Sequence, residues 1–170
     1  MDSLIASAIS AASVLIAVLA LVYSVQQVHL MRRQNLLPVA LDFFREARTP
    51  EWFAARDWVI KHLAAECSPD LGVSGLPEPA REHVRKVGFF YDNLGVFVAY
   101  HVVEEDLVLG FFGVGMNEAW AIMYPFIRRE EEIRKMQYLV FFNDLVVRFR
   151  EHSPADIYRK RGLRRADGGS

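Results

Sequence analysis

The sequence has little cysteine and no excess of charge of either sign. Cys67 is the single cysteine in 170 residues, so no disulfide bond can form within the chain. This excludes the disulfide-stapled scaffolds of small secreted domains and agrees with a reducing compartment. Because 20 basic residues face 21 acidic ones, no overall field would attract nucleic acid, and we expect no nucleic-acid partner.

Motifs for catalysis and metal binding are also lacking. None of the five histidines has Glu three residues before it, so the Glu-x-x-His motif of di-iron bundles is missing. The glycines at 110, 113 and 115 are not followed by the Lys-Ser or Lys-Thr of a phosphate loop. No Gly-x-Ser-x-Gly nucleophile turn occurs. We therefore predict a protein that is not an enzyme, with no catalytic residues, no metal and no cofactor.

What the sequence does have is a long uncharged run at its N-terminus. Residues 4–25 carry no charged side chain, and 22 residues in a helix cover roughly 33 Å, close to the thickness of a bilayer's hydrocarbon core. A cleaved signal peptide would begin with basic residues and have a shorter apolar stretch. A buried helix of a soluble protein would carry polar residues on one face. The run therefore predicts a single transmembrane anchor within residues 1–28.

The flanking charges predict how this anchor is oriented. No Lys or Arg precedes the run, whereas Arg32 and Arg33 follow it closely. Basic residues mark the cytoplasmic side of a span, so we expect the N-terminus outside the cell inner membrane and the remaining chain in the cytoplasm. Ser3, Ser7 and Ala11 recur every four residues, a spacing of small residues that allows two membrane helices to pair.

Helical periodicity without strand alternation marks the remaining chain. We predict an all-α fold in which the anchor continues through a stalk helix, residues 29–48, into a cytoplasmic bundle of four to five helices, residues 49–152. Thr49 and Pro50 form a helix start, and the one clear loop spans 67–79. The expected helices run from 50 to about 66, from Pro79 to about 103, from 107 to about 134 and from 135 to about 151.

Two stretches of this bundle are apolar enough to suggest a rival topology. Residues 87–103 and 107–127 would form a second membrane hairpin, making the protein a subunit of a larger membrane complex. Charged and amide side chains within them weigh against insertion, since an Asp inside a span costs about 2.5–3.5 kcal/mol. These side chains either make interhelix contacts or line a polar pocket for a small molecule or lipid: Asp92, Asn93, Asn117 and Glu118.

Charged residues gather in two further segments. The run from Arg128 to Glu132 alternates in sign and predicts a solvated helix face with ion pairs one turn apart. The tail, residues 153–170, is polar and basic, which predicts disorder. Its basic residues either keep the protein soluble, contact anionic lipid beside the anchor or bind nucleic acid: Arg159, Lys160, Arg161, Arg164 and Arg165.

Several stretches of the chain resemble an uncharacterised bacterial family of single-pass membrane proteins with an all-helical cytoplasmic domain, described as a domain of unknown function. The resemblance rests on Met31-Arg32-Arg33-Gln34-Asn35, Phe43-Phe44-Arg45-Glu46, Thr49-Pro50-Glu51-Trp52-Phe53, Arg56-Asp57-Trp58, Phe89-Phe90-Tyr91-Asp92-Asn93-Leu94-Gly95 and Trp120-x-x-x-x-Pro125-Phe126-Ile127. It implies the same topology and transfers no activity. We therefore expect a membrane-anchored helical module that binds a protein partner or itself.

Overall fold

The computed structural model describes residues 16, 20, 21, 23, 24, 41–152 and 154–164. Every regular element among these residues is a helix, which confirms the all-α prediction. The chain divides into two compact units, residues 1–42 and 43–170. In the first unit, the five described residues between 16 and 24 are helical and exposed. Most of the predicted anchor, the orienting residues Arg32 and Arg33, and most of the stalk lie outside the described residues.

The second unit begins with a helical turn that ends near residue 46, followed by helix α2, Pro50–Lys61. Thr49 caps α2, because its hydroxyl accepts a hydrogen bond from the Trp52 amide at 3.2 Å. This start agrees with the predicted one. The predicted helix to about 66 is interrupted at His62, after which α3, Leu63–Glu66, and the 3-10 turn η1, Pro69–Leu71, lead into the loop.

Helix α4, Ala80–Ala99, carries the apolar seam expected from its periodicity. The buried residues of this seam follow in steps of three and four: Val84, Val87, Tyr91, Leu94 and Val98. The helix ends four residues earlier than expected. Glycine allows the backbone of helix α6, Val140–Glu151, to approach α4 closely, because a Cβ on Gly95 would lie 2.3 Å from the carbonyl oxygen of Phe141.

Helix α5, Glu105–Arg134, is the longest element and includes Pro125. One side of it is buried against the other helices, including Met116, Trp120, Met123 and Ile127. Among the described residues, α5 alone is long and apolar enough to cross a membrane, and 44% of its most apolar window is buried inside the fold. A core helix passes the same test of length and composition, so the predicted hairpin over 87–127 stays a prediction.

The last two helices differ from the sequence expectation. Helix α6 spans Val140–Glu151 instead of starting at 135, because Lys135 and Leu139 adopt left-handed backbone conformations with φ of 58° and 54°. Where we expected a disordered tail, residues 154–160 form helix α7, Pro154–Lys160. The Ile157 side chain is buried, and this apolar contact holds the otherwise charged segment against α5. Residues 165–170 lie outside the described part.

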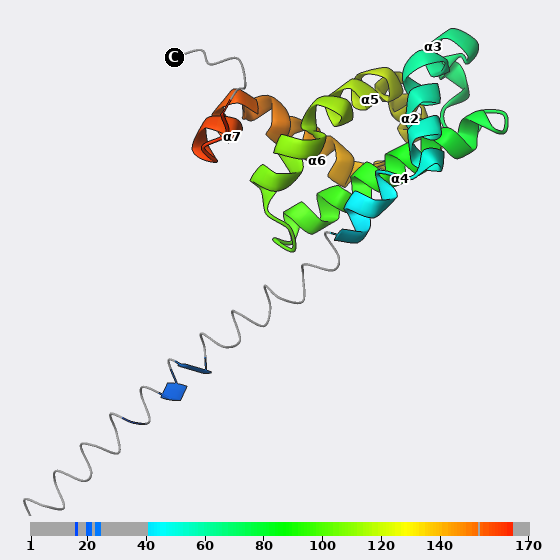
Figure 1. The fold of residues 1–170 in the computed structure, drawn as a ribbon. Coiled ribbons are helices and arrows are strands. Elements are labelled where there is room, and N and C mark those ends of the chain that lie inside the picture. The colour runs from blue at the N-terminus through cyan, green and yellow to red at the C-terminus, as the bar shows by residue number, and fades with distance from the viewer. Residues whose placement is uncertain (1–15, 17–19, 22, 25–40, 153, 165–170) are drawn as a thin grey trace, which may run out of the picture. The chain divides into compact units, whose positions relative to one another are not determined.

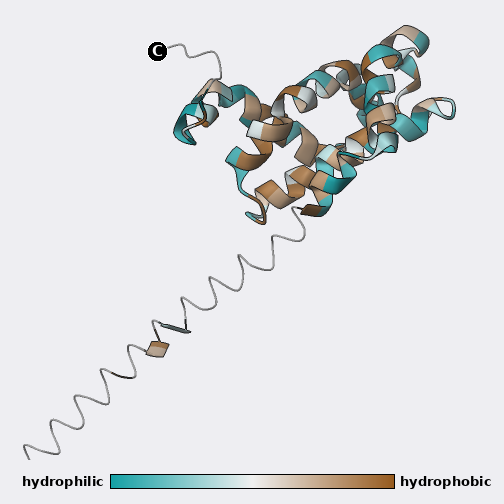
Figure 2. Ribbon diagram, in the orientation of Figure 1, coloured by the Kyte–Doolittle hydropathy of each residue, from teal (hydrophilic) through white to brown (hydrophobic). Residues whose placement is uncertain are grey.

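Figure 1 shows α4, α5 and α6 side by side, with α2 and α3 at one end and α7 at the other. Hydrophobic residues recur along α4, α5 and α6, whereas α7 is largely hydrophilic (Figure 2). Aromatic rings fill much of the interior, including Trp52 against Phe90 at 5.0 Å and Trp120 against Phe142 at 4.8 Å between centroids. One continuous core therefore organises residues 43–160, and α7 completes it.

Candidate interaction surface

The outer side of α5 near its N-terminus carries a row of exposed apolar side chains. Leu107, Phe111 and Val114 follow in steps of four and three, so they share one helix face. Their exposed fractions are 45%, 54% and 65%. Single exposed apolar residues are ordinary on protein surfaces, whereas a contiguous row of them marks an interaction site.

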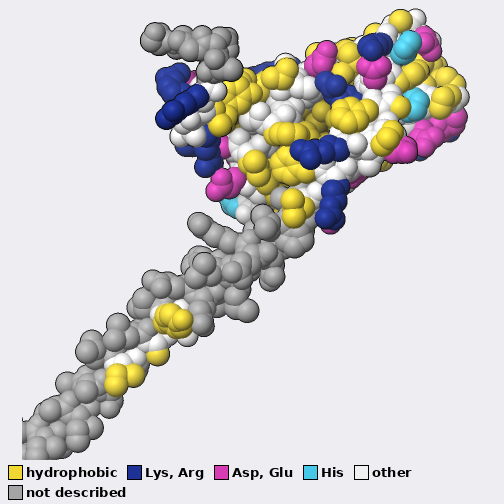
Figure 3. Space-filling view, in the orientation of Figure 1, with side chains coloured by type: hydrophobic (Ala, Val, Ile, Leu, Met, Phe, Trp, Pro, Cys, Tyr) yellow, Lys and Arg dark blue, Asp and Glu magenta, His cyan; other side chains and the backbone are white. Residues whose placement is uncertain are grey.

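This row borders an apolar groove between α5 and α7. The groove has a volume of about 380 Å³, and its lining includes Leu107, Phe111, Ile157, Tyr158 and Leu163. Helix α7 contacts α5 at Gly110, whose carbonyl accepts a hydrogen bond from the Tyr158 hydroxyl at 3.3 Å. Leu163, just beyond α7, is 65% exposed. We call Leu107, Phe111, Val114, Tyr158 and Leu163 the α5–α7 surface. Figure 3 shows hydrophobic side chains next to the basic side chains of α7.

Ion pairs close one rim of the groove. Arg161 contacts Glu104 at 2.7 Å and Asp106 at 3.1 Å, and Lys160 contacts Asp106 at 2.8 Å. The hydrogen bond from Lys160 is the main reason that the pKa of Asp106 lies below its ordinary value. The two acidic and two basic groups compensate each other, so this rim presents charges of both signs without an excess of either.

The basic residues predicted to contact lipid are thus mostly engaged with acidic neighbours. Arg159 pairs with Asp156 within α7, and Lys160 and Arg161 form the rim just described. Arg164 is described and exposed, and Arg165 lies outside the described residues. The structure therefore gives three of these five residues a role within the fold; their predicted lipid contact stays a prediction.

The four polar residues predicted to line one pocket are not brought together. Asp92 accepts a hydrogen bond from the Phe142 amide at 3.0 Å and so caps the N-terminus of α6, while Asn93 is exposed. The other two contact different helices: Asn117 accepts from Arg150 at 2.9 Å, and Glu118 pairs with Arg56 at 3.0 Å. Three of these four residues therefore make interhelix contacts, which was the alternative to a polar pocket in the sequence analysis.

A small pocket lies instead where α5 meets α6. It has a volume of about 230 Å³, and its lining includes Trp120, Tyr124, Tyr138, Glu131 and Asn143. The Glu131 carboxylate is already engaged, since it accepts from the Tyr138 amide at 3.2 Å and pairs with Arg128 at 3.1 Å. The pocket is lined by aromatic, acidic, basic and amide groups at once, so its composition selects no single class of ligand.

The comparisons with known proteins give a family. A family described as a domain of unknown function, DUF4760, matches residues 7–149. The chain belongs to this family. No curated protein and no solved structure matches the chain. The match includes most of the apolar run, helices α2 to α5 and most of α6, so the resemblance to an uncharacterised family is confirmed.

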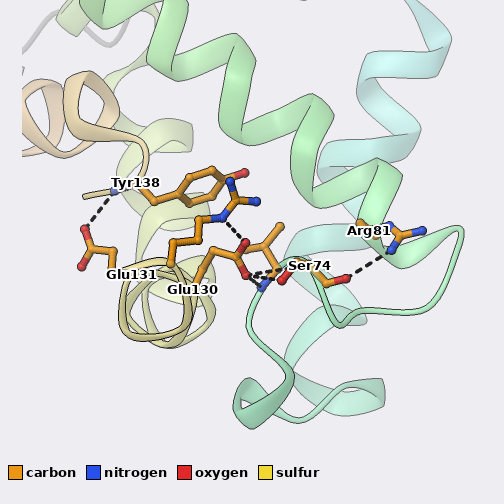
Figure 4. A network of polar contacts seen from close by, with 7 residues as sticks. Ser74, Arg81, Glu130, Glu131 and Tyr138 are labelled. Atoms are coloured by element: carbon orange, nitrogen blue, oxygen red, sulfur yellow. Dashed lines mark hydrogen bonds and ion pairs between the residues drawn. The ribbon is translucent and has the colours of Figure 1, made fainter. Parts of the chain in front are cut away.

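Among the described residues of this DUF4760 chain, the most buried charged side chain is one that the sequence pattern placed at the surface. Glu130 was expected on a solvated face but is fully buried. One carboxylate oxygen accepts hydrogen bonds from the Val73 amide and the Ser74 amide, both at 2.8 Å, and from the Ser74 hydroxyl at 2.9 Å. The other oxygen pairs with Arg134. Figure 4 shows this carboxylate holding the loop before α4 against the end of α5.

The electrostatics of Glu130 agree with a charged, structural carboxylate. Burial alone would raise its pKa, but the hydrogen bonds from Ser74 and Arg134 together lower it below the ordinary value. Arg81 extends the network by donating to the Ser74 carbonyl at 3.2 Å. All polar atoms of the Glu130 side chain are engaged in holding the loop, so the arrangement is suited to stability and not to proton transfer.

Metal ligands do not gather in the part of the chain that the structure describes, where no three His, Cys, Asp or Glu side chains lie together. Burial is the main reason that the pKa of the Cys67 thiol is raised, which keeps it in the less reactive protonated form. The α5–α7 surface therefore remains the strongest candidate for function in this family member. The signal that could have found it is the row of apolar residues at 107, 111 and 114 on the face of α5 opposite the core seam.

Proposed function

We propose that the chain is a membrane-anchored helical interaction module without catalytic activity, which binds a protein partner or a second copy of itself. A single N-terminal span holds it in the cell inner membrane, with the N-terminus outside and residues 43–164 in the cytoplasm. Arg32 and Arg33 set this orientation. The uncharged run and its flanking charges support the placement, and the α5–α7 surface supports the interaction.

The exposed α5–α7 surface is the single observation that carries the interaction. Val114 and Leu163 are each 65% exposed although both are aliphatic. The interior beneath them is closely packed, with Val108, Leu109 and Met116 nearly inaccessible. Leaving such side chains in water forfeits about 25 cal/mol for each Å² of apolar surface that a partner would bury. A protein partner that covers the row and groove recovers this free energy.

Photocrosslinking in living cells tests the proposal. A photoreactive amino acid replaces Phe111 in the full chain, and in a matched variant it replaces Met136, which is 64% exposed two residues beyond the C-terminal end of α5. We expect a protein adduct from position 111 and none from 136. An equal yield from both positions, or no adduct from 111 in protein recovered from the membrane fraction, would contradict the proposal.

Reporter fusions test the placement separately. An enzyme that is active only in the cytoplasm is fused after Ser170, and a reporter active only outside is fused at the same position in a second strain. We expect activity from the first fusion alone. Exchanging Arg32 and Arg33 for Ser should weaken this bias because the remaining positive charges lie further from the span. Activity from the second fusion alone would overturn the orientation.

A further inference from the structure

The place where the chain enters the helical domain lies beside the α5–α7 surface. The Phe44 ring lies 4.8 Å from the Phe111 ring, edge to face, and 5.5 Å from the Phe112 ring. Phe44 therefore links the first residues of this unit to the exposed row on α5. Any pairing of the segments that precede residue 43 would bring two entry points, and with them two such surfaces, close together.

The rim charges favour one class of occupant over the others. A surface that docks on anionic lipid needs basic groups that are free to meet phosphate, but Lys160 and Arg161 are paired with Glu104 and Asp106. Because the rim charges are balanced within one copy, two identical rims repel each other little when their apolar rows face one another. In a symmetric dimer the same patch on both subunits makes the contact, which a mixed rim permits.

The sequence adds an independent reason for self-association. Small residues recur at Ser3, Ser7 and Ala11, a spacing that allows anchor helices to approach. Because every copy carries an identical anchor, all copies have the same orientation in the bilayer and the same linker to the helical domain. Once two anchors pair, the linkers hold the two domains together at an effective concentration of about the millimolar range, so even a modest apolar patch suffices.

We propose that the α5–α7 surface is a homodimer interface, in which Leu107, Phe111 and Val114 of one copy pack against the same surface of a second copy. This inference rests on the proposed function, because it names the partner that the exposed surface would take. It commits to a second copy of this chain and not to lipid or to another protein.

Cysteine crosslinking in membranes tests the dimer. In a Cys67→Ser background, single cysteines are placed in turn at Leu107, Phe111, Val114 and Leu163. The controls are Ile133→Cys, in the last turn of α5, and Met136→Cys, just beyond that helix. Because an interface holds thiols together, we expect at least about tenfold more oxidant-induced dimer at one or more surface positions than at either control. Two differently tagged copies of the full chain should also co-purify, and Val114→Asp should reduce this co-purification several-fold while Met136→Asp leaves it unchanged.

The outcomes separate this inference from the proposed function. Dimers of twice the chain mass from the surface positions support both. Adducts from position 111 of any other mass, with no cysteine dimer at the four positions, overturn the homodimer and leave the interaction module standing. No adduct and no dimer from any surface position overturn both. Equal dimer yields at surface and control positions indicate random collision and also overturn the homodimer.

Discussion

Removal of the Glu130 carboxylate should destabilise the helical domain more than any other single loss of charge. Glu130→Ala leaves the Val73 amide, which is buried, and the Ser74 amide without their acceptor. Hydrogen bonds to a charged group contribute about 1.5–3 kcal/mol each. Ser74 is only partly buried, so water can replace one of these bonds in part. We therefore expect a loss of about 3–5 kcal/mol in the free energy of unfolding.

Urea denaturation of the full chain in detergent micelles measures this loss. All three tryptophans, Trp52, Trp58 and Trp120, lie in the helical domain, so their fluorescence reports on its unfolding. Glu132→Ala is the matched control, because Glu132 pairs with Arg129 on the same helix at 3.0 Å but with both side chains about half exposed. An exposed pair of this kind contributes about 0–1 kcal/mol. Equal destabilisation by the two variants would refute the structural role of Glu130.

The pH dependence gives a second test of the same residue. The pKa of Glu130 is lowered in the folded state relative to its ordinary value of 4.5. Its stabilisation is therefore fully present above pH 4.5 and is lost as the pH falls through the folded-state pKa. The difference in unfolding free energy between the wild type and Glu130→Gln should shrink below pH 4.5. A difference that stays constant down to pH 3 would contradict the reasoning.

Three further predictions, at Gly95, Asp92 and Tyr91, test the packing of the fold. Gly95→Ala should destabilise the domain by more than about 2 kcal/mol in urea unfolding, because its Cβ would overlap the Phe141 backbone. The control Gly110→Ala should be neutral or stabilising, since its Cβ would meet only ordinary contacts. A larger loss of stability in Gly110→Ala than in Gly95→Ala would contradict the α4–α6 packing. Asp92→Ala should cost about 1 kcal/mol through loss of the α6 cap, and no change in the urea midpoint would exclude that cap. Burial raises the pKa of Tyr91 to about 12. Its contribution to the free energy of unfolding should therefore fall as the pH rises above about 10, the ordinary pKa of tyrosine. In Tyr91→Phe, the free energy of unfolding should decrease less at alkaline pH than in the wild type.

Local signals in the sequence were enough to place several elements. The start of α2 was predictable because Thr49 and Pro50 act within one turn of the helix that they begin. The seam of α4 was predictable because burial follows a period of 3.6 residues. The family resemblance also came from the sequence. These features depend on residues close together in the chain.

The missed features depend on contacts between distant segments. The late start of α6 follows from the left-handed backbone of Leu139, a conformation that favours glycine; its side chain packs at Gly88 of α4. The cap of α6 comes from Asp92, which lies 50 residues earlier. Helix α7 forms because burial of the Ile157 side chain against α5 stabilises it. No local pattern specifies these partners.

Glu130 is different, because a local signal for its burial was present. It continues the buried seam of α5 in steps of three and four after Trp120, Met123 and Ile127. The surrounding run of charges suggested a solvated face, but only the seam position decides which of those charges points inward. Loop amides at Val73 and Ser74 then supply the partners that a buried carboxylate requires.

The most direct test of an interaction module is the mass of the particle that contains the chain after gentle extraction from its membrane. Wild type is compared with Val114→Ser and with Met136→Ser, since the two side chains are 65% and 64% exposed. We predict that wild type and Met136→Ser form a complex larger than one 19.5 kDa chain with its detergent, and that Val114→Ser shifts toward the single chain while keeping its unfolding midpoint. A wild-type particle that holds one chain and no partner would contradict the account.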